Sequence, residues 1–179
     1  VAGLILTIVT GVRGDVRGMA FSYLTAMMFW RTIAWGALFY LLIHHLTNSI
    51  WSVVIRRIWE NIAGIIPVLG IAFIPVLLMV THIYPWTDHH LVEHSDILRK
   101  KVSYLNIPFF TIRGIIYWII LSWMAVRLRL LSFKQDEAPD HITHKNFVRI
   151  SAPGMLLYAL VVTFAAFDWM MSLQPEWNS

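Results

Sequence analysis

Four long apolar segments constrain the fold of this chain more than any other feature of its sequence. Each is long enough to cross about 30 Å of hydrocarbon as a helix, at about 1.5 Å per residue. Strands of a membrane barrel would be only about ten residues long and would alternate polar with apolar residues. We therefore predict an all-α, polytopic transmembrane helix bundle, with spans at about 19–46, 51–83, 109–126 and 153–173.

The composition excludes several other classes of protein. Of the 179 residues, 58% are hydrophobic and 13% are charged, whereas soluble domains have about 45–50% and about 25%. Disorder requires low hydrophobicity and high net charge, and neither is present. The sequence has no cysteine, which rules out disulfides, iron–sulfur ligation and cysteine-linked haem within it. The net charge is +4, and the 14 Lys and Arg residues are scattered among the apolar segments and their loops. They form no basic stripe, so we expect no nucleic-acid partner.

The ends and turns of the chain suggest how it is organised. Residues 1–10 are apolar but too short for a span, so we interpret them as the tail of a truncated helix and 11–179 as the bundle. The chain is then a fragment of a larger subunit. The span 51–83 contains Pro67 and Pro75, which predict a kink.

Loop charges indicate how the spans are oriented. Two long polar loops are expected at 84–108 and 127–152. Lys and Arg number seven on the side of 127–152 and five on the side of 84–108. Because positive loops remain inside, we predict a multi-pass membrane protein with 127–152 cytoplasmic and 84–108 on the opposite side, which the resemblance given below makes the periplasmic side of a bacterial inner membrane.

Four ionisable residues stand out inside the spans, namely Arg31, Glu60, Arg113 and Asp168. Each costs about 2.5–3.5 kcal/mol to insert, so each needs a partner or a hydrated cavity. Counting residues from the span ends places Arg113 and Asp168 at one depth on consecutive helices. This predicts an ion pair or a water-bridged contact, with Arg31 and Glu60 as a second, looser pair.

Two further arginines and one histidine belong to the same set of candidates. Arg56 and Arg57 precede Glu60 by four and three residues, so both can reach its carboxylate on a helix. His82, just inside a span end, is a candidate proton relay. Two interpretations remain open: the charges hold helices together, or Glu60 and Asp168 exchange protons along a hydrated path. We predict no catalytic, cofactor-binding or metal-binding residue. A haem in particular is not expected, since the histidines do not lie in pairs at one depth.

Three segments carry a resemblance to a known family. They are WSVVIRRIWEN at 51–61, YLNIPFFTIRGIIY at 104–117 and FDWMMSLQPEWNS at 167–179. In this order they resemble the ActF subunits of bacterial alternative complex III, which are members of the NrfD-like family of membrane anchors. The matching motifs include the candidate residues Arg56, Arg57, Glu60, Arg113, Asp168 and Ser172.

The resemblance implies a role in electron transport. Alternative complex III oxidises menaquinol or another quinol and passes electrons to a periplasmic carrier or a terminal oxidase, in respiratory or photosynthetic chains. Its c-type haems, iron–sulfur clusters and quinone belong to partner subunits, with quinol oxidation assigned to ActC. The implied role is a cofactor-free plasma-membrane subunit in contact with those subunits and with lipids. It would be a scaffold. Whether it also contains a proton-conducting path is a question that the resemblance does not answer.

Two alternatives remain at this point. The chain could itself line a quinone pocket, which needs aromatic and aliphatic walls with a few polar groups. It could also be a secondary transporter bundle, for which kinked helices with buried charge are typical.

Overall fold

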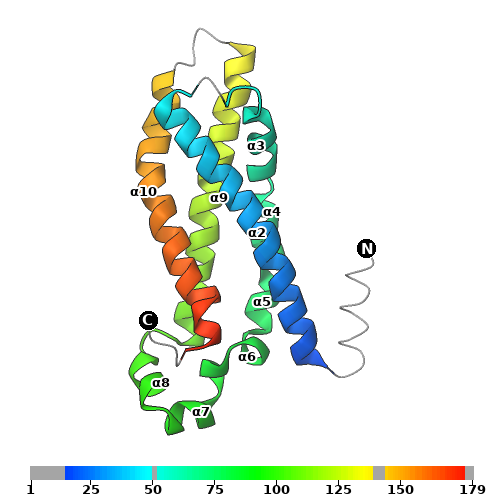
Figure 1. Ribbon diagram of the computed structural model, residues 1–179, viewed down its shortest axis with the longest axis vertical. Coiled ribbons are helices and arrows are strands. Elements are labelled where there is room, and N and C mark those ends of the chain that lie inside the picture. Colours follow the sequence, from blue (N-terminus) through cyan, green and yellow to red (C-terminus); the bar gives the residue numbers. More distant parts are fainter. Residues whose placement is uncertain (1–14, 50–51, 139–143, 176–179) are drawn as a thin grey trace. The chain divides into compact units, whose positions relative to one another are not determined.

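Helices form the whole architecture of the part of the chain that is described. The computed structural model describes residues 15–49, 52–138 and 144–175; the predicted helix tail at 1–10 lies outside them. No strand occurs within these ranges, so the all-α prediction is confirmed. The elements in chain order (Figure 1) are α2 (Val16–Thr47), α3 (Arg56–Ala63), α4 (Ile66–Ala72), α5 (Ile74–Leu78), α6 (Val80–Ile83), η1 (Pro85–Thr87), α7 (His89–His94), α8 (Asp96–Lys101), α9 (Ile107–Glu137), α10 (His144–Trp169) and η2 (Met171–Leu173).

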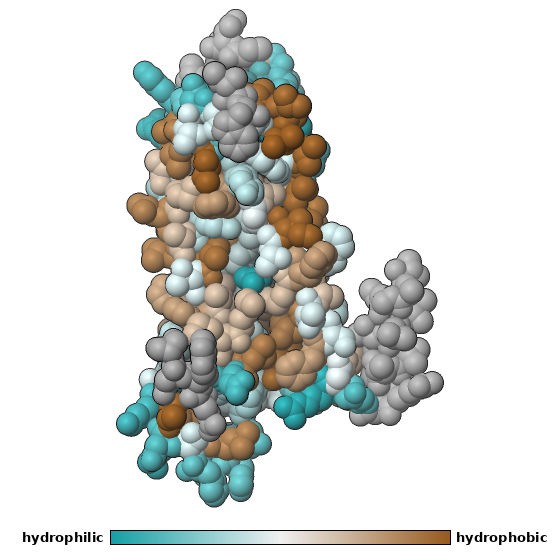
Figure 2. Space-filling view, in the orientation of Figure 1, coloured by the Kyte–Doolittle hydropathy of each residue, from teal (hydrophilic) through white to brown (hydrophobic). Residues whose placement is uncertain are grey.

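Four helical stretches are long and apolar enough to cross a membrane. They are Val16–Thr47, Arg56–Leu78, Ile107–Glu137 and His144–Leu173. Many of their apolar side chains are exposed, among them Val68, Ile71 and Leu78. Figure 2 shows such hydrophobic side chains over the visible surface of the long helices. Apolar surface of this extent is what lipid tails cover, and the chain is a multi-pass membrane protein.

Both predicted loops are largely helical, which corrects the sequence-based boundaries. In 127–152, α9 continues to Glu137 and α10 already begins at His144, so Pro153 lies inside α10. Arg, Lys, Leu and Gln are good helix formers and extend α9 beyond the hydrocarbon. In 84–108, Asp88 caps α7 by accepting from the His90 N–H, and Ser95 caps α8 by accepting from the Leu98 N–H. The surface of α7 and α8 is mostly hydrophilic (Figure 2).

The predicted kink in the second span is a series of helix breaks. Pro67 and Pro75 stand at the second residue of α4 and α5, where the missing N–H is tolerated. Val76 N–H donates to the Phe73 carbonyl instead of the Ala72 carbonyl. The Tyr23 hydroxyl donates to the freed Ala72 carbonyl at 2.6 Å. A neighbouring side chain thus satisfies a backbone group that water could not reach in hydrocarbon.

The chain divides into two compact units, each with its own aromatic core. The first comprises 15–29, 72–115 and 164–175 among the described residues, and its core includes Phe73, Phe110 and Trp169. The second comprises 30–71, 116–138 and 144–163. Its core includes the Trp35 and Trp118 rings, packed edge to face at 5.4 Å.

Within the second unit, Gly154 of α10 allows a close approach of two other helices. A Cβ there would lie 3.3 Å from both Leu42 Cδ2 and Met124 Cε. We expect Gly154→Leu to lower the free energy of unfolding by about 1–3 kcal/mol through overpacking, measured by thermal unfolding in detergent. Gly36→Leu is the matched control, because a Cβ at Gly36 meets no atom within 4 Å. Equal destabilisation by both substitutions would contradict the close approach.

Candidate functional site

Arg113 of α9 and Asp168 of α10 form a two-bond ion pair in the first unit. Arg113 Nε donates to Asp168 Oδ2 at 2.8 Å, and Nη2 donates to Oδ1 at 2.8 Å. Asp168 is fully buried and Arg113 is 8% exposed. The contact predicted from their shared depth is confirmed as a direct ion pair. A guanidinium bound to a carboxylate through both oxygens has the strongest and most directional geometry of its kind.

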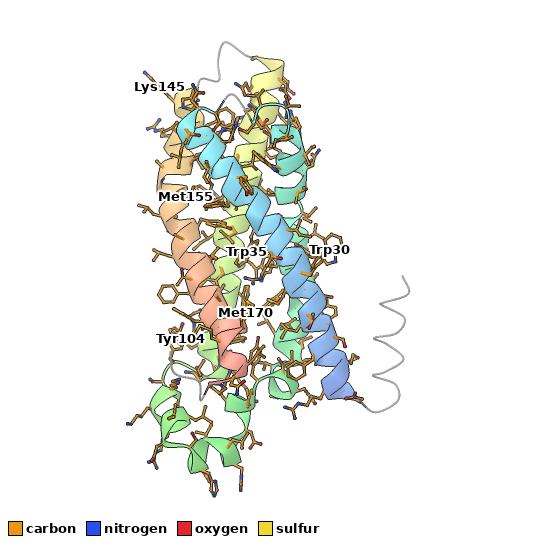
Figure 3. The ribbon with its side chains drawn as sticks, in the orientation of Figure 1. Trp30, Trp35, Tyr104, Lys145, Met155 and Met170 are labelled. Atoms are coloured by element: carbon orange, nitrogen blue, oxygen red, sulfur yellow. The ribbon has the colours of Figure 1, made fainter. Side chains whose placement is uncertain are left out.

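Tyr104 and Phe109 cover the guanidinium of Arg113. Its Cζ atom lies 3.9 Å from the centre of the Tyr104 ring and 4.2 Å from that of Phe109, within cation–π range. Arg113 Nη1 also donates to the Tyr104 carbonyl at 3.1 Å. Burial, followed by the negative charge of Asp168, raises the pKa of the Tyr104 hydroxyl, so this hydroxyl keeps its proton. Figure 3 shows the Tyr104 side chain near the end of α10.

Three further hydrogen bonds hold the end of α10 and the residues that follow it. One is local, and two come from side chains of other segments. The Ser172 hydroxyl donates to the Asp168 carbonyl, which satisfies a terminal helix acceptor. Tyr84 donates to the Trp169 carbonyl at 3.2 Å. Lys101 Nζ donates to the Pro175 carbonyl at 2.7 Å. The candidate residue Ser172 therefore belongs to the same cluster as Arg113 and Asp168.

An open cavity of about 450 Å³ lies beside this cluster. Its walls are mainly apolar and aromatic, and its polar groups come from two lysines, a tyrosine and a serine. The lining residues are Lys100, Lys101, Tyr104, Leu105, Phe164, Phe167, Met171, Ser172 and Pro175.

A second cluster surrounds Glu60, in the second unit. Glu60 is 3% exposed, and each of its oxygens accepts from one arginine of its own helix. Arg56 Nε donates to Oε1 at 2.7 Å, and Arg57 Nη1 donates to Oε2 at 2.9 Å. The pairing predicted from the three- and four-residue spacings is confirmed.

Three side chains of α9 complete the second cluster, and their contacts are not among those predicted from the sequence. The Ser132 hydroxyl accepts from Arg56 at 2.7 Å and from Arg57 at 2.9 Å. Gln135 accepts from Arg56 at 3.0 Å, and Asp136 pairs with Arg57. The predicted span ends at residue 126, which places these residues in a loop. The run of helix-forming residues after 126 was the signal that could have placed them on α9.

Two candidate residues remain, Arg31 in the second unit and His82 in the first. Glu60 bonds directly to Arg56 and Arg57, which lie three and four residues away on the same helix. The looser pairing of Arg31 with Glu60 stays a prediction. Arg31 is buried, with Cζ 4.7 Å from the Trp35 ring centre. His82 is exposed and lines a different cavity from the one beside Asp168.

No protein-family model matches this chain, and no curated protein matches it. Within the described ranges, no group of three or more His, Asp or Glu side chains could hold a metal ion. The two ion-pair clusters are thus interpreted from their geometry. The first buries a carboxylate against one guanidinium group and the second buries a carboxylate against two, arrangements that can fix helices in register.

We expect Asp168→Asn to lower the free energy of unfolding by about 3–5 kcal/mol, because it leaves the buried guanidinium of Arg113 without its counter-charge. Thermal unfolding in detergent measures this loss. Asp96→Asn is the matched control: it breaks an exposed pair with Arg99, which contributes only about 0–1 kcal/mol.

A double variant separates the ion pair from packing at the same position. Arg113→Met combined with Asp168→Leu removes both charges together, so it should cost less than Asp168→Asn alone. A double variant that is no more stable than the single one would show that the charge pairing is not the source of the loss.

Proposed function

We propose that this chain is a cofactor-free scaffold subunit of a quinol-oxidising complex of the alternative complex III type, in the bacterial inner membrane. One observation carries the proposal. The segments 104–117 and 167–179, which resemble ActF, supply Arg113 and Asp168 of the first cluster. The third such segment, 51–61, supplies Arg56, Arg57 and Glu60 of the second. The residues that carry the resemblance thus build both ion-pair clusters.

The geometry favours a scaffold over a proton path. A carboxylate on a proton path must lie within hydrogen-bond reach of a group that gives up or takes up a proton, and arginine stays protonated. Both oxygens of Asp168 and both oxygens of Glu60 accept hydrogen bonds from arginine. Holding α9 against α10 through Arg113 and Asp168 is the role that this arrangement performs best.

The remaining parts of the proposal concern partners and orientation. Because the sequence has no cysteine, iron–sulfur clusters and c-type haems would belong to neighbouring subunits, and quinol oxidation would belong to an ActC-type subunit. The segment 84–108 would face the periplasm and 127–152 the cytoplasm, following the excess of Lys and Arg. The exposed apolar helix faces would be covered by lipid and by those subunits.

Affinity purification from native membranes tests the proposal. We expect the tagged protein to copurify with c-type haem absorbance, iron–sulfur resonance signals and quinol-dependent electron transfer. An unrelated tagged multi-pass protein from the same membranes is the control. Isolation of the chain without any haem protein, or with solute transport of its own, would reject the proposal.

Glu60→Gln in the purified complex distinguishes the scaffold from a proton path. A scaffold predicts a lower yield of complex with an unchanged electron-transfer rate for each complex that forms. Full assembly combined with lost proton translocation would instead favour the proton path.

The cavity beside Tyr104 favours a second candidate function, in which this chain lines a quinone pocket. Its volume of about 450 Å³, its aromatic walls and its few polar groups match the pattern of small-molecule sites. On this function Met171→Trp, which fills the cavity, should raise the KM for quinol about tenfold. Met170→Trp is the matched control, since Met170 is exposed and does not line the cavity. Equal KM values for the two variants would reject this function.

A further inference from the structure

A groove with a basic rim lies between α9 and α10 in the second unit. It has a volume of about 370 Å³ and is lined by Arg127 and Leu131 of α9 and by Asn146, Arg149 and Ile150 of α10. Both arginines are exposed. Among the residues that the structure describes, neither arginine forms an ion pair, in contrast to Arg56, Arg57 and Arg113.

The position of the two arginines along the sequence matches the level of lipid phosphates. Arg127 directly follows the apolar stretch 109–126, and Arg149 precedes Pro153, where the next apolar stretch begins, by four residues. Hydrocarbon therefore ends close to both guanidinium groups. Basic pockets between transmembrane helices at this level bind phosphate head groups.

Exposed apolar side chains continue the groove toward the hydrocarbon. Trp123 lies one helical turn from Arg127 on the same face of α9 and is 52% exposed. Leu156 lies two turns from Arg149 on the same face of α10 and is 71% exposed. A ligand that fits this surface carries a phosphate at one end and acyl chains at the other.

We propose that this groove is a binding site for an anionic phospholipid, with its phosphodiester held between Arg127 and Arg149. Two exposed guanidinium groups with no ion-pair partner among the described residues favour a lipid with net negative charge over a zwitterionic one. The site is independent of the proposed electron-transfer role, because it needs only the membrane and the pairing of α9 with α10. The bound lipid would act as a bridge between the two helices.

Native mass spectrometry of the purified protein with added lipids tests the site. We expect phosphatidylglycerol to bind more tightly than phosphatidylcholine. Arg127→Gln with Arg149→Gln should weaken phosphatidylglycerol about thirtyfold, which corresponds to about 1 kcal/mol for each arginine. Inorganic phosphate at the same concentration should not compete, because it lacks acyl chains.

The matched control removes the same charge from nearby positions outside the groove. Lys134 and Lys145 are exposed lysines that do not line it, and Figure 3 labels Lys145. Lys134→Gln with Lys145→Gln should therefore leave the affinity unchanged. Equal weakening by both double variants, equal binding of the two lipids, or displacement by inorganic phosphate would overturn the proposal.

A second measurement leaves both arginines in place and so does not depend on the folding of the double variant. The sequence has no cysteine, so Leu156→Cys provides a single position for a fluorescent label on the apolar surface that continues the groove, where the acyl chains of the bound lipid are expected. Phosphatidylglycerol with brominated acyl chains should quench this label more strongly than brominated phosphatidylcholine. Equal quenching by the two lipids would contradict the site.

Discussion

The cost of an unpaired charge in hydrocarbon is the constraint on which the rest of this structure depends. Several ionisable residues are buried within the spanning helices, and the pair Arg113–Asp168 shows how the cost is offset. Because both oxygens of the carboxylate accept from the guanidinium, the pair fixes the rotation of α9 and α10 as well as their separation. Tyr84 and Lys101 donate to the Trp169 and Pro175 carbonyls close to this pair.

The same constraint applies to the backbone. A helix that is broken three times between Arg56 and Ile83 would expose carbonyl groups to lipid. The Tyr23 hydroxyl removes one such exposure by donating to Ala72. At the second cluster, Ser132 accepts from two arginines at once. Side-chain hydroxyl groups thus satisfy both a backbone carbonyl and a pair of arginines.

The sequence allowed prediction of those contacts that depend on distance along a helix. Arg56 and Arg57 reach Glu60 because of their spacing, and Arg113 meets Asp168 because their depths agree. Ser132 and Asp136 could not be found in this way, because their role depends on which face α9 turns toward α3. Depth alone also did not predict that Glu60 bonds Arg56 and Arg57 through both of its oxygens. The cavity beside Tyr104 depends on packing between distant segments and has no local sequence signal.

The aromatic cover over Arg113 has a consequence for the ionic conditions in which the protein works. Mobile salt ions screen exposed charges, with a Debye length of about 10 Å at 0.1 M and about 3 Å at 1 M. They weaken the exposed pair of Asp96 and Arg99. They do not enter the space between the Tyr104 ring and the Arg113 guanidinium, which lies 3.9 Å from the ring centre. The contact between α9 and α10 at this pair therefore depends much less on the salinity on either side of the membrane than an exposed ion pair would.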